Sequence, residues 1–252
     1  MNTNIYELNA GGRAVRYLLQ YPGSERYFTE PLRPCPGGEY DLALTPGQME
    51  FGRALFPPDT PDDWLEYKLL LTDTAAFLLR SAACIIHGVA FSWRDRAWLL
   101  CAPSGTGKTT QFAHWKRLCG ADVRLVSGDQ PIVTLEADGE VLVWASPWTG
   151  KERWTGVSGP VPLGGIIFLE QAEENELISD PLDDRAQQLL AAFMCRPDAV
   201  EEIRTLAALA DAMLSRHPVW LLRNRGDPAS ALLTRNAIEA YLSEGRQNDE
   251  TL

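Results

Sequence analysis

The sequence has few positive charges and no unbroken apolar run long enough to cross a membrane. Its 252 residues contain 23 Lys and Arg against 34 Asp and Glu, which gives a net charge of −11. Nucleic acids and anionic membranes bind clustered cations, so this balance argues against both as general partners. The most apolar stretch, LLLTDTAAFLLRSAACII, is interrupted by Asp73 and Arg80. It therefore does not predict a transmembrane helix.

The chain also has few cysteines and no pattern of a secretory leader. The start, MNTNIYELNAGG, contains neither a basic segment nor the apolar segment of a signal peptide. The five cysteines are an odd number without CxxC spacing: Cys35, Cys84, Cys101, Cys119 and Cys195. We interpret them as small buried apolar residues, in preference to a metal or redox role. A cytoplasmic location is expected, because thiols stay reduced there.

Turn motifs separate the first part of the chain from the rest. YPGSE, CPGGEY and TPGQ are typical of turns between short elements, and two short strands flank an Asn-Ala-Gly-Gly turn. We predict a small β-rich lobe over residues 1–58 and a core domain over residues 59–245. Residues 246–252 are polar and are predicted to form a disordered tail.

The core domain begins with a predicted helix and continues as alternating strands and helices. Pro61, Asp62 and Asp63 are typical of a helix start, and this helix is predicted to run to about Ala82. Strands are predicted at CIIHGVAFSW, AWLLCA, VRLVS, PIVTLEADGEVLVWAS (a hairpin), LGGIIFLE and PVWLLR. Helices are predicted at TTQFAHWKRLCG, LDDRAQQLLAAFM, AVEEIRTLAALADAML and PASALLTRNAIEAYL, and AEENELISDPLDD is interpreted as a solvated connection. This order predicts an α/β fold.

The segment CAPSGTGKTTQ, residues 101–111, matches a phosphate-binding loop if alanine replaces the first glycine of the pattern. It follows a predicted strand and opens a predicted helix. Gly105 and Gly107 would let backbone amides turn toward an anion, and the helix dipole would add to their field. Lys108 would reach the β- and γ-phosphates, and the Thr109 hydroxyl would bind Mg²⁺. The alternative is a solvated Gly-Ser loop.

A second carboxylate is needed to complete such a metal site. VRLVSGDQP supplies Asp129 directly after an apolar strand. We predict that this strand is a neighbour of the loop strand and presents Asp129 to the γ-phosphate. The alternative for Asp129 is a turn residue before Pro131.

Several segments together resemble the HPr serine kinase and phosphoenolpyruvate carboxykinase superfamily, in particular small HPr-kinase-related proteins. They are HGVAFSWRDRAWLLCAPSGTGKTTQ, LVSGDQPIV, ASPWTGKE and PLGGIIFLE, and the resemblance covers residues 85–170. It implies a P-loop core of mixed sheet flanked by helices, beside the small β-rich lobe. It also implies ATP and Mg²⁺ as cofactors and a hydroxyl as acceptor, on a serine of a small protein or peptide.

The resemblance also implies roles for individual residues. The triphosphate would be held by the loop residues Ser104, Gly105, Thr106, Gly107, Lys108, Thr109 and Thr110. Asp129 would serve the metal or the acceptor hydroxyl, and His87, Lys151 and Glu152 would line the same site. Judged by chemistry alone, a lone histidine in an apolar strand is more often a hydrogen-bonded core residue, and charged loop residues such as Lys151 and Glu152 are usually solvated.

The sequence departs from the family at the second motif. Family members commonly carry an Asp-Asp pair, and this chain has Gly128-Asp129. Either Asp129 performs both tasks, or another carboxylate such as Glu152 helps, or the protein binds nucleotide without transferring phosphate. The choice between a protein and a metabolite acceptor, the choice between ATP and GTP, and the oligomeric state stay open. NRGD at residues 224–227 resembles the guanine-reading motif of GTPases, but we interpret Asp227 as the cap of the last helix.

Overall fold

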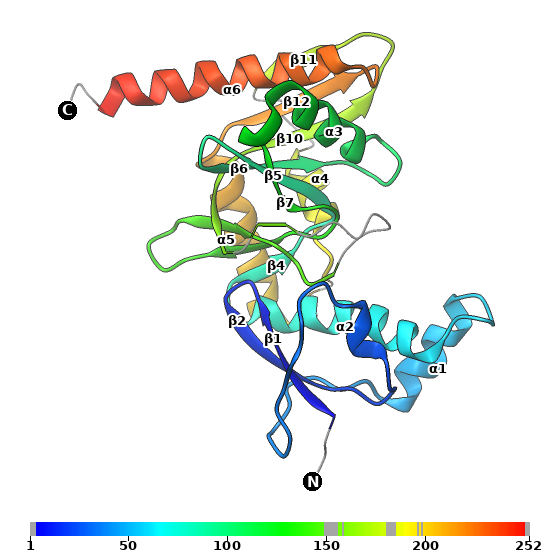
Figure 1. The fold of residues 1–252 in the computed structure, drawn as a ribbon. Coiled ribbons are helices and arrows are strands. Elements are labelled where there is room, and N and C mark those ends of the chain that lie inside the picture. The colour runs from blue at the N-terminus through cyan, green and yellow to red at the C-terminus, as the bar shows by residue number, and fades with distance from the viewer. Residues whose placement is uncertain are drawn as a thin grey trace.

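The computed structural model describes residues 4–148, 156–157, 159–179, 185–195, 197 and 199–249. Figure 1 shows a small N-terminal lobe at the bottom and a larger α/β core above it. The strands are β1 (Ile5–Ala10), β2 (Arg13–Leu18), β3 (Arg33–Pro34), β4 (Ala83–Ile85), β5 (Gly88–Trp93), β6 (Arg96–Cys101), β7 (Arg124–Ser127), β8 (Ile132–Leu135), β9 (Val141–Trp144), β10 (Val161–Gln171), β11 (Glu176–Ser179) and β12 (Val219–Asn224). The helices are α1 (Pro46–Leu55), α2 (Asp62–Leu79), α3 (Lys108–Cys119), α4 (Arg185–Ala192), α5 (Val200–Ser215) and α6 (Pro228–Asp249), with short 3-10 turns η1 (Ser24–Tyr27) and η2 (Gly120–Asp122).

The N-terminal lobe is a three-stranded antiparallel sheet packed on α1 and α2. Its strand order is β2-β1-β3, and the predicted Asn-Ala-Gly-Gly turn joins β1 to β2. Tyr17 and Phe28 from the lobe share one hydrophobic cluster with Leu70 of α2 and with Ile85 and Ile132 of the core sheet. The apolar face of the lobe therefore continues through α2 into the core. The boundary at residue 58 stays a prediction.

The core sheet is mixed, and it has nine strands within the described residues. Its main path is β4-β8-β9-β10-β6-β5-β7, and β12 pairs with β10 and β11 with β12. Strands β6, β10 and β12 are mutually parallel, whereas β5 is antiparallel to both β6 and β7. The structure thus has the predicted α/β class, with a mixed sheet flanked by helices.

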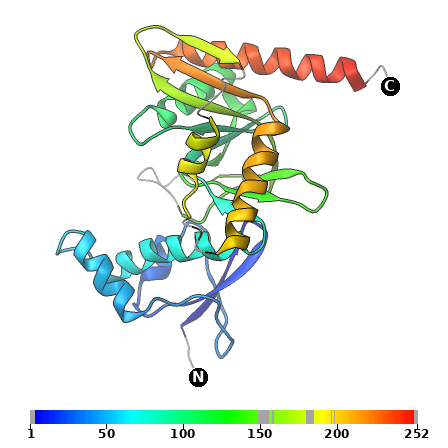
Figure 2. The same cartoon turned by 180° about the vertical axis from the view of Figure 1, so that it is seen from behind.

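Helices cover both faces of this sheet, and alternate residues of the strands point to opposite faces. On one face, Phe91 and Trp98 cluster with Trp115 of α3 and Ile238 of α6. On the other face, Leu99 clusters with Leu189 of α4 and with residues of α5. Figure 2, seen from behind, shows α4 and α5 on this second face. Among the described helices, none is both long and apolar enough to span a bilayer.

Three predictions about elements are corrected. The acidic segment predicted as a solvated connection contains β11, which pairs antiparallel with β12. The run CIIHGVAFSW forms two strands, because β4 ends at Ile85 and β5 begins at Gly88. His87 therefore lies between strands rather than inside one. Helix α6 continues to Asp249, whereas a disordered tail was predicted from residue 246.

Candidate functional site

Three segments meet at one edge of the core sheet because of the strand directions. Strand β5 is antiparallel to β6 and to β7, so the start of β5 lies at the same edge as the ends of β6 and β7. His87 precedes β5, residues 102–107 follow β6, and Asp129 follows β7. The strand before Asp129 was predicted to neighbour the loop strand, which is wrong because β5 lies between them. The shared edge still brings Asp129 to the loop.

The loop owes its shape to two glycines with left-handed backbone. Gly105 has φ 82° and Gly107 has φ 108°, and a Cβ atom added at either would meet no atom within 4 Å. Backbone conformation, and not space, therefore requires glycine at both positions. Gly107 is the N-cap of α3 and provides no side chain to the first amides of the helix. These amides and the helix dipole make the N-terminus of α3 a favourable place for an anion.

Lys108 lies beneath the loop with its ammonium group held by three acceptors. The residue is only 7% exposed. Its Nζ donates to the carbonyl oxygens of Ala102, at 2.7 Å, and Pro103, at 3.1 Å. It also lies 3.1 Å from Nε2 of His87. Burial lowers the pKa of Lys108, and the carboxylate of Asp129 opposes this shift.

His87 connects Lys108 to Asp129. Its Nδ1 lies 3.6 Å from Oδ1 of Asp129, and both side chains are partly exposed. An ammonium group has no lone pair, so Nε2 of His87 must accept from Lys108 and the ring proton must be on Nδ1, facing Asp129. Burial and the charge of Lys108 lower the pKa of His87, and Asp129 opposes them. The imidazole is accordingly neutral at neutral pH.

Two further residues of this site were missed in the sequence. Lys68 of α2 is partly buried, with its Nζ 5.5 Å from the ring centroid of Trp64 and 5.4 Å from that of Tyr67. Burial lowers its pKa and the charge of Asp129 opposes the shift, so α2 brings a second cation toward Asp129. Gln171, at the end of β10, has its Nε2 3.4 Å from the carbonyl oxygen of Gly105. The apolar spacing of α2 and β10 gives no local signal for either contact.

The other predicted site residues differ in their exposure to solvent. Ser104 and Thr110 are exposed, and Thr106 and Thr109 are partly buried. Lys151 and Glu152 lie outside the described residues, so their predicted roles stay predictions.

The donor set fits Mg²⁺ bound together with phosphate. The Thr109 hydroxyl and the Asp129 carboxylate are hard oxygen donors, which this ion prefers. Within the described ranges, no group of three or more His, Cys, Asp or Glu residues could hold a metal ion. A site that relies on one carboxylate, phosphate oxygens and water matches the usual coordination of Mg²⁺.

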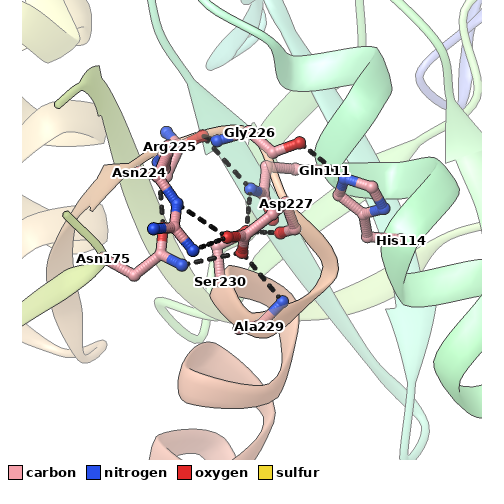
Figure 3. A network of polar contacts seen from close by, with 9 residues as sticks. All are labelled: Gln111, His114, Asn175, Asn224, Arg225, Gly226, Asp227, Ala229 and Ser230. Carbon is pink, nitrogen blue, oxygen red and sulfur yellow. Dashed lines mark hydrogen bonds and ion pairs between the residues drawn. The ribbon is translucent and has the colours of Figure 1, made fainter. Parts of the chain in front are cut away.

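The segment NRGD forms a polar network beside α3, shown in Figure 3. Oδ1 of Asp227 accepts from the backbone N–H of Ala229, at 3.0 Å, and from Nδ2 of Asn175, at 2.7 Å. Arg225 forms an ion pair with the same carboxylate. The prediction that Asp227 caps the last helix is therefore confirmed. Its oxygens are occupied within the protein, which disfavours a role in reading a nucleobase.

No family model matches the chain, and no curated protein matches it. Among solved structures, the HPr(Ser) kinase/phosphatase from Coxiella burnetii is similar over 66% of this chain and 95% of that chain. The TM-score is 0.40 and the sequence identity is 11%.

Proposed function

We propose that this protein binds ATP with Mg²⁺ at residues 104–110 and transfers the γ-phosphoryl group to a hydroxyl, on a serine of a small protein or peptide. One observation carries the proposal: Lys108, His87 and Asp129 converge at the N-terminus of α3, beneath a loop shaped by two glycines. A cation, a neutral imidazole and a carboxylate at a helix N-terminus suit phosphoryl transfer, which depends mainly on positioning and charge stabilisation.

Each residue has a distinct role in this proposal. The amides of residues 104–109 hold the phosphate oxygens, and Lys108 leaves the carbonyls of Ala102 and Pro103 to neutralise their charge. Asp129 orients the acceptor hydroxyl and takes its proton, and His87 keeps the carboxylate and the lysine apart. Bound ATP and Mg²⁺ would supply the phosphoryl group and further charge neutralisation. Thr109 and Asp129 would hold the metal ion.

Helix α2 favours an acceptor site on the side of the N-terminal lobe. It contributes Lys68, whose ammonium lies against two aromatic rings and within the field of Asp129. This cation belongs to α2 and not to the phosphate loop, and we infer that it attracts a negative group on the acceptor. The same argument applies to a phosphorylated or acidic metabolite, which stays an alternative acceptor.

A nucleotide-binding regulatory module without transfer activity is the second candidate. The observation that favours it is the single carboxylate: the residue before Asp129 is Gly128, and Asp129 is the acidic group facing His87. One carboxylate then has to serve both the metal and the acceptor proton.

The test separates binding from transfer. ATP binding is measured by calorimetry with Mg²⁺, and transfer by a phosphoryl mass increment on candidate acceptors. Lys108→Ala is expected to abolish both, and Asp129→Asn to abolish transfer while ATP still binds. Lys116→Ala on the same helix and Asp122→Asn on the surface are the matched controls. Binding of ATP by the wild type without transfer or hydrolysis supports the regulatory module, and absence of nucleotide binding contradicts both candidates.

A further inference from the structure

We propose that Cys84 and Cys195 form a modification site, a dithiol that a hydroperoxide converts to a disulfide. Their Sγ atoms lie 3.4 Å apart, although the residues are 111 positions apart in the sequence. Cys84 is on β4, and Cys195 follows the end of α4. The site does not depend on the proposed nucleotide chemistry. For Cys84 and Cys195, a reactive pair of thiols replaces the interpretation as inert buried residues.

The backbone register explains why the two thiols face each other. Ile86 and Phe193 form an antiparallel bridge. The N–H of His87 donates to the carbonyl of Ala192, at 2.7 Å, and the N–H of Met194 donates to the carbonyl of Ile85, at 2.8 Å. These two bonds lie on either side of Ile86 and Phe193, whose own backbone groups are not hydrogen-bonded to each other. Continued by two positions, the register of this isolated bridge leads to Cys84 on one side and Cys195 on the other, which agrees with the contact between their sulfur atoms.

This position suits a disulfide. Residues opposite each other in a non-hydrogen-bonded antiparallel pair have Cα atoms about 4.5 Å apart. Disulfides span Cα separations of roughly 4.4–6.8 Å. Bond formation therefore needs rotation of the side chains to close the gap between the sulfur atoms, and the backbone can keep its register.

The two cysteines differ in a way that assigns their order of reaction. Cys195 is partly exposed and Cys84 is fully buried. The hydrogen bond with Cys84 lowers the pKa of Cys195, whereas burial raises the pKa of Cys84. Cys195 is thus the sulfur that ionises first and that an oxidant can reach.

The reaction then follows in two steps. The Cys195 thiolate attacks one peroxide oxygen, the O–O bond breaks, and sulfenic acid and hydroxide form. The sulfur of Cys84 attacks the sulfenic sulfur, the S–O bond breaks, and the proton of Cys84 leaves with the oxygen as water. Two thiols and one hydroperoxide give one disulfide and, for hydrogen peroxide, two water molecules.

The bond would fix the chain next to the candidate active site. The end of α4 and the segment after it contact the backbone around His87: the carbonyl of Ala192 accepts from the N–H of His87, and the N–H of Met194 donates to the carbonyl of Ile85. A covalent bond between Cys84 and Cys195 ties this segment to β4 just beyond that contact. The oxidised protein therefore has less freedom in the backbone that positions His87.

The experiment treats the purified full chain with hydrogen peroxide and maps its peptides without reduction. We expect the loss of two hydrogen atoms and one linked peptide pair that contains Cys84 and Cys195, reversed by dithiothreitol. Cys195→Ser removes the linked pair, whereas the control variants Cys35→Ser and Cys119→Ser retain it. Circular dichroism checks that each variant is folded.

The variant Cys84→Ala provides a second test if Cys195→Ser does not fold. In Cys84→Ala the sulfenic acid on Cys195 cannot be resolved, so dimedone labelling of Cys195 is expected to rise above that of the wild type. A disulfide that joins other cysteines overturns the proposal. Oxidation of Cys195 to sulfinic or sulfonic acid in the wild type also overturns it. The same holds if both thiols can still be alkylated after peroxide treatment and unfolding, because then no disulfide has formed.

Discussion

At the scale of single residues, the site is a row of three side chains from separate parts of the chain. Lys108 contacts His87, and His87 faces Asp129. The imidazole lies between a cation and an anion, so its pKa responds to both charges. Burial and the charge of Lys108 lower the pKa of His87, and the charge of Asp129 raises it.

This arrangement gives a prediction for the titration of His87. In the wild type its pKa lies below the ordinary value of 6.5. Asp129→Asn removes the anion that stabilises the imidazolium, so the pKa falls further. Lys108→Met removes the competing cation, so the pKa rises. The measurement is an NMR pH titration of the imidazole, with Asp122→Asn as the control that leaves it unchanged. Equal pKa values in all four proteins would contradict the described row.

The sequence was sufficient for some site residues and not for others. Lys108 and Asp129 stand in short motifs whose spacing has a chemical reason, so both could be proposed for the candidate site from the sequence. Lys68 and Gln171 have no such signal, because their positions depend on how α2 packs on the core and on the parallel pairing of β10 with β6. Those arrangements follow from contacts between distant segments, which periodicity does not encode.

At the scale of elements, the loop and α3 depend on the left-handed conformation of Gly107. Gly107→Ala would place a side chain at φ 108°, which costs about 1–3 kcal/mol. We expect a lower free energy of unfolding and a loss of affinity for ATP on the order of tenfold. Added bulk is not the cause, because a Cβ atom there meets nothing within 4 Å.

The control for this prediction is Gly47→Ala in α1. A Cβ at Gly47 also meets no atom within 4 Å, and its φ lies outside the left-handed range. Alanine is favoured over glycine in a helix, so this change is neutral or stabilising. Chemical denaturation and calorimetry compare the two variants. Equal effects would mean that the loop conformation does not require glycine.

Elements with strong local signals were predicted, and those that depend on a partner were not. The hairpin of β5 and β6 has two apolar runs around a short polar turn. By contrast, β11 has exposed or partly exposed residues throughout and is held by β12 in an antiparallel edge pair. The break at His87 likewise depends on the segment after α4, which bonds to the backbone there.

At the scale of the whole molecule, Glu66 of α2 holds the N-terminal lobe in place. Its side chain is fully buried, and it accepts from the N–H of Gln20, at 2.7 Å, the N–H of Tyr21, at 3.1 Å, and the hydroxyl of Ser24. Glu66→Ala leaves these donors unpaired and should cost about 3 kcal/mol of unfolding free energy. Urea denaturation measures the loss, and Glu50→Ala on the exposed side of α1 is the control. A loss no larger than that of the control would contradict this role.

The whole molecule should also lose stability in mild acid through His217. Burial, with Arg96 and Arg216 nearby, lowers the pKa of His217 to about 4. Between pH 6.5 and pH 4 the unfolded chain binds a proton that the folded chain excludes, so stability falls as the pH falls through this window. His217→Gln removes this contribution. Denaturation at pH 7.5 and pH 5 should show a smaller drop in the variant, and an equal drop would contradict the assignment.

The parallel pairs of β10 join parts of the chain that are synthesised far apart. Residues 97–101 of β6 pair with residues 163–168, and residues 219–224 of β12 pair with residues 166–171. A growing chain thus makes β6 and the loop at residues 102–107 long before β10, the parallel neighbour of β6. Since closure of such long segments is slow, the nascent chain leaves the apolar edge of β6 uncovered for much of its synthesis. Chaperone binding during translation is expected to concentrate on that interval.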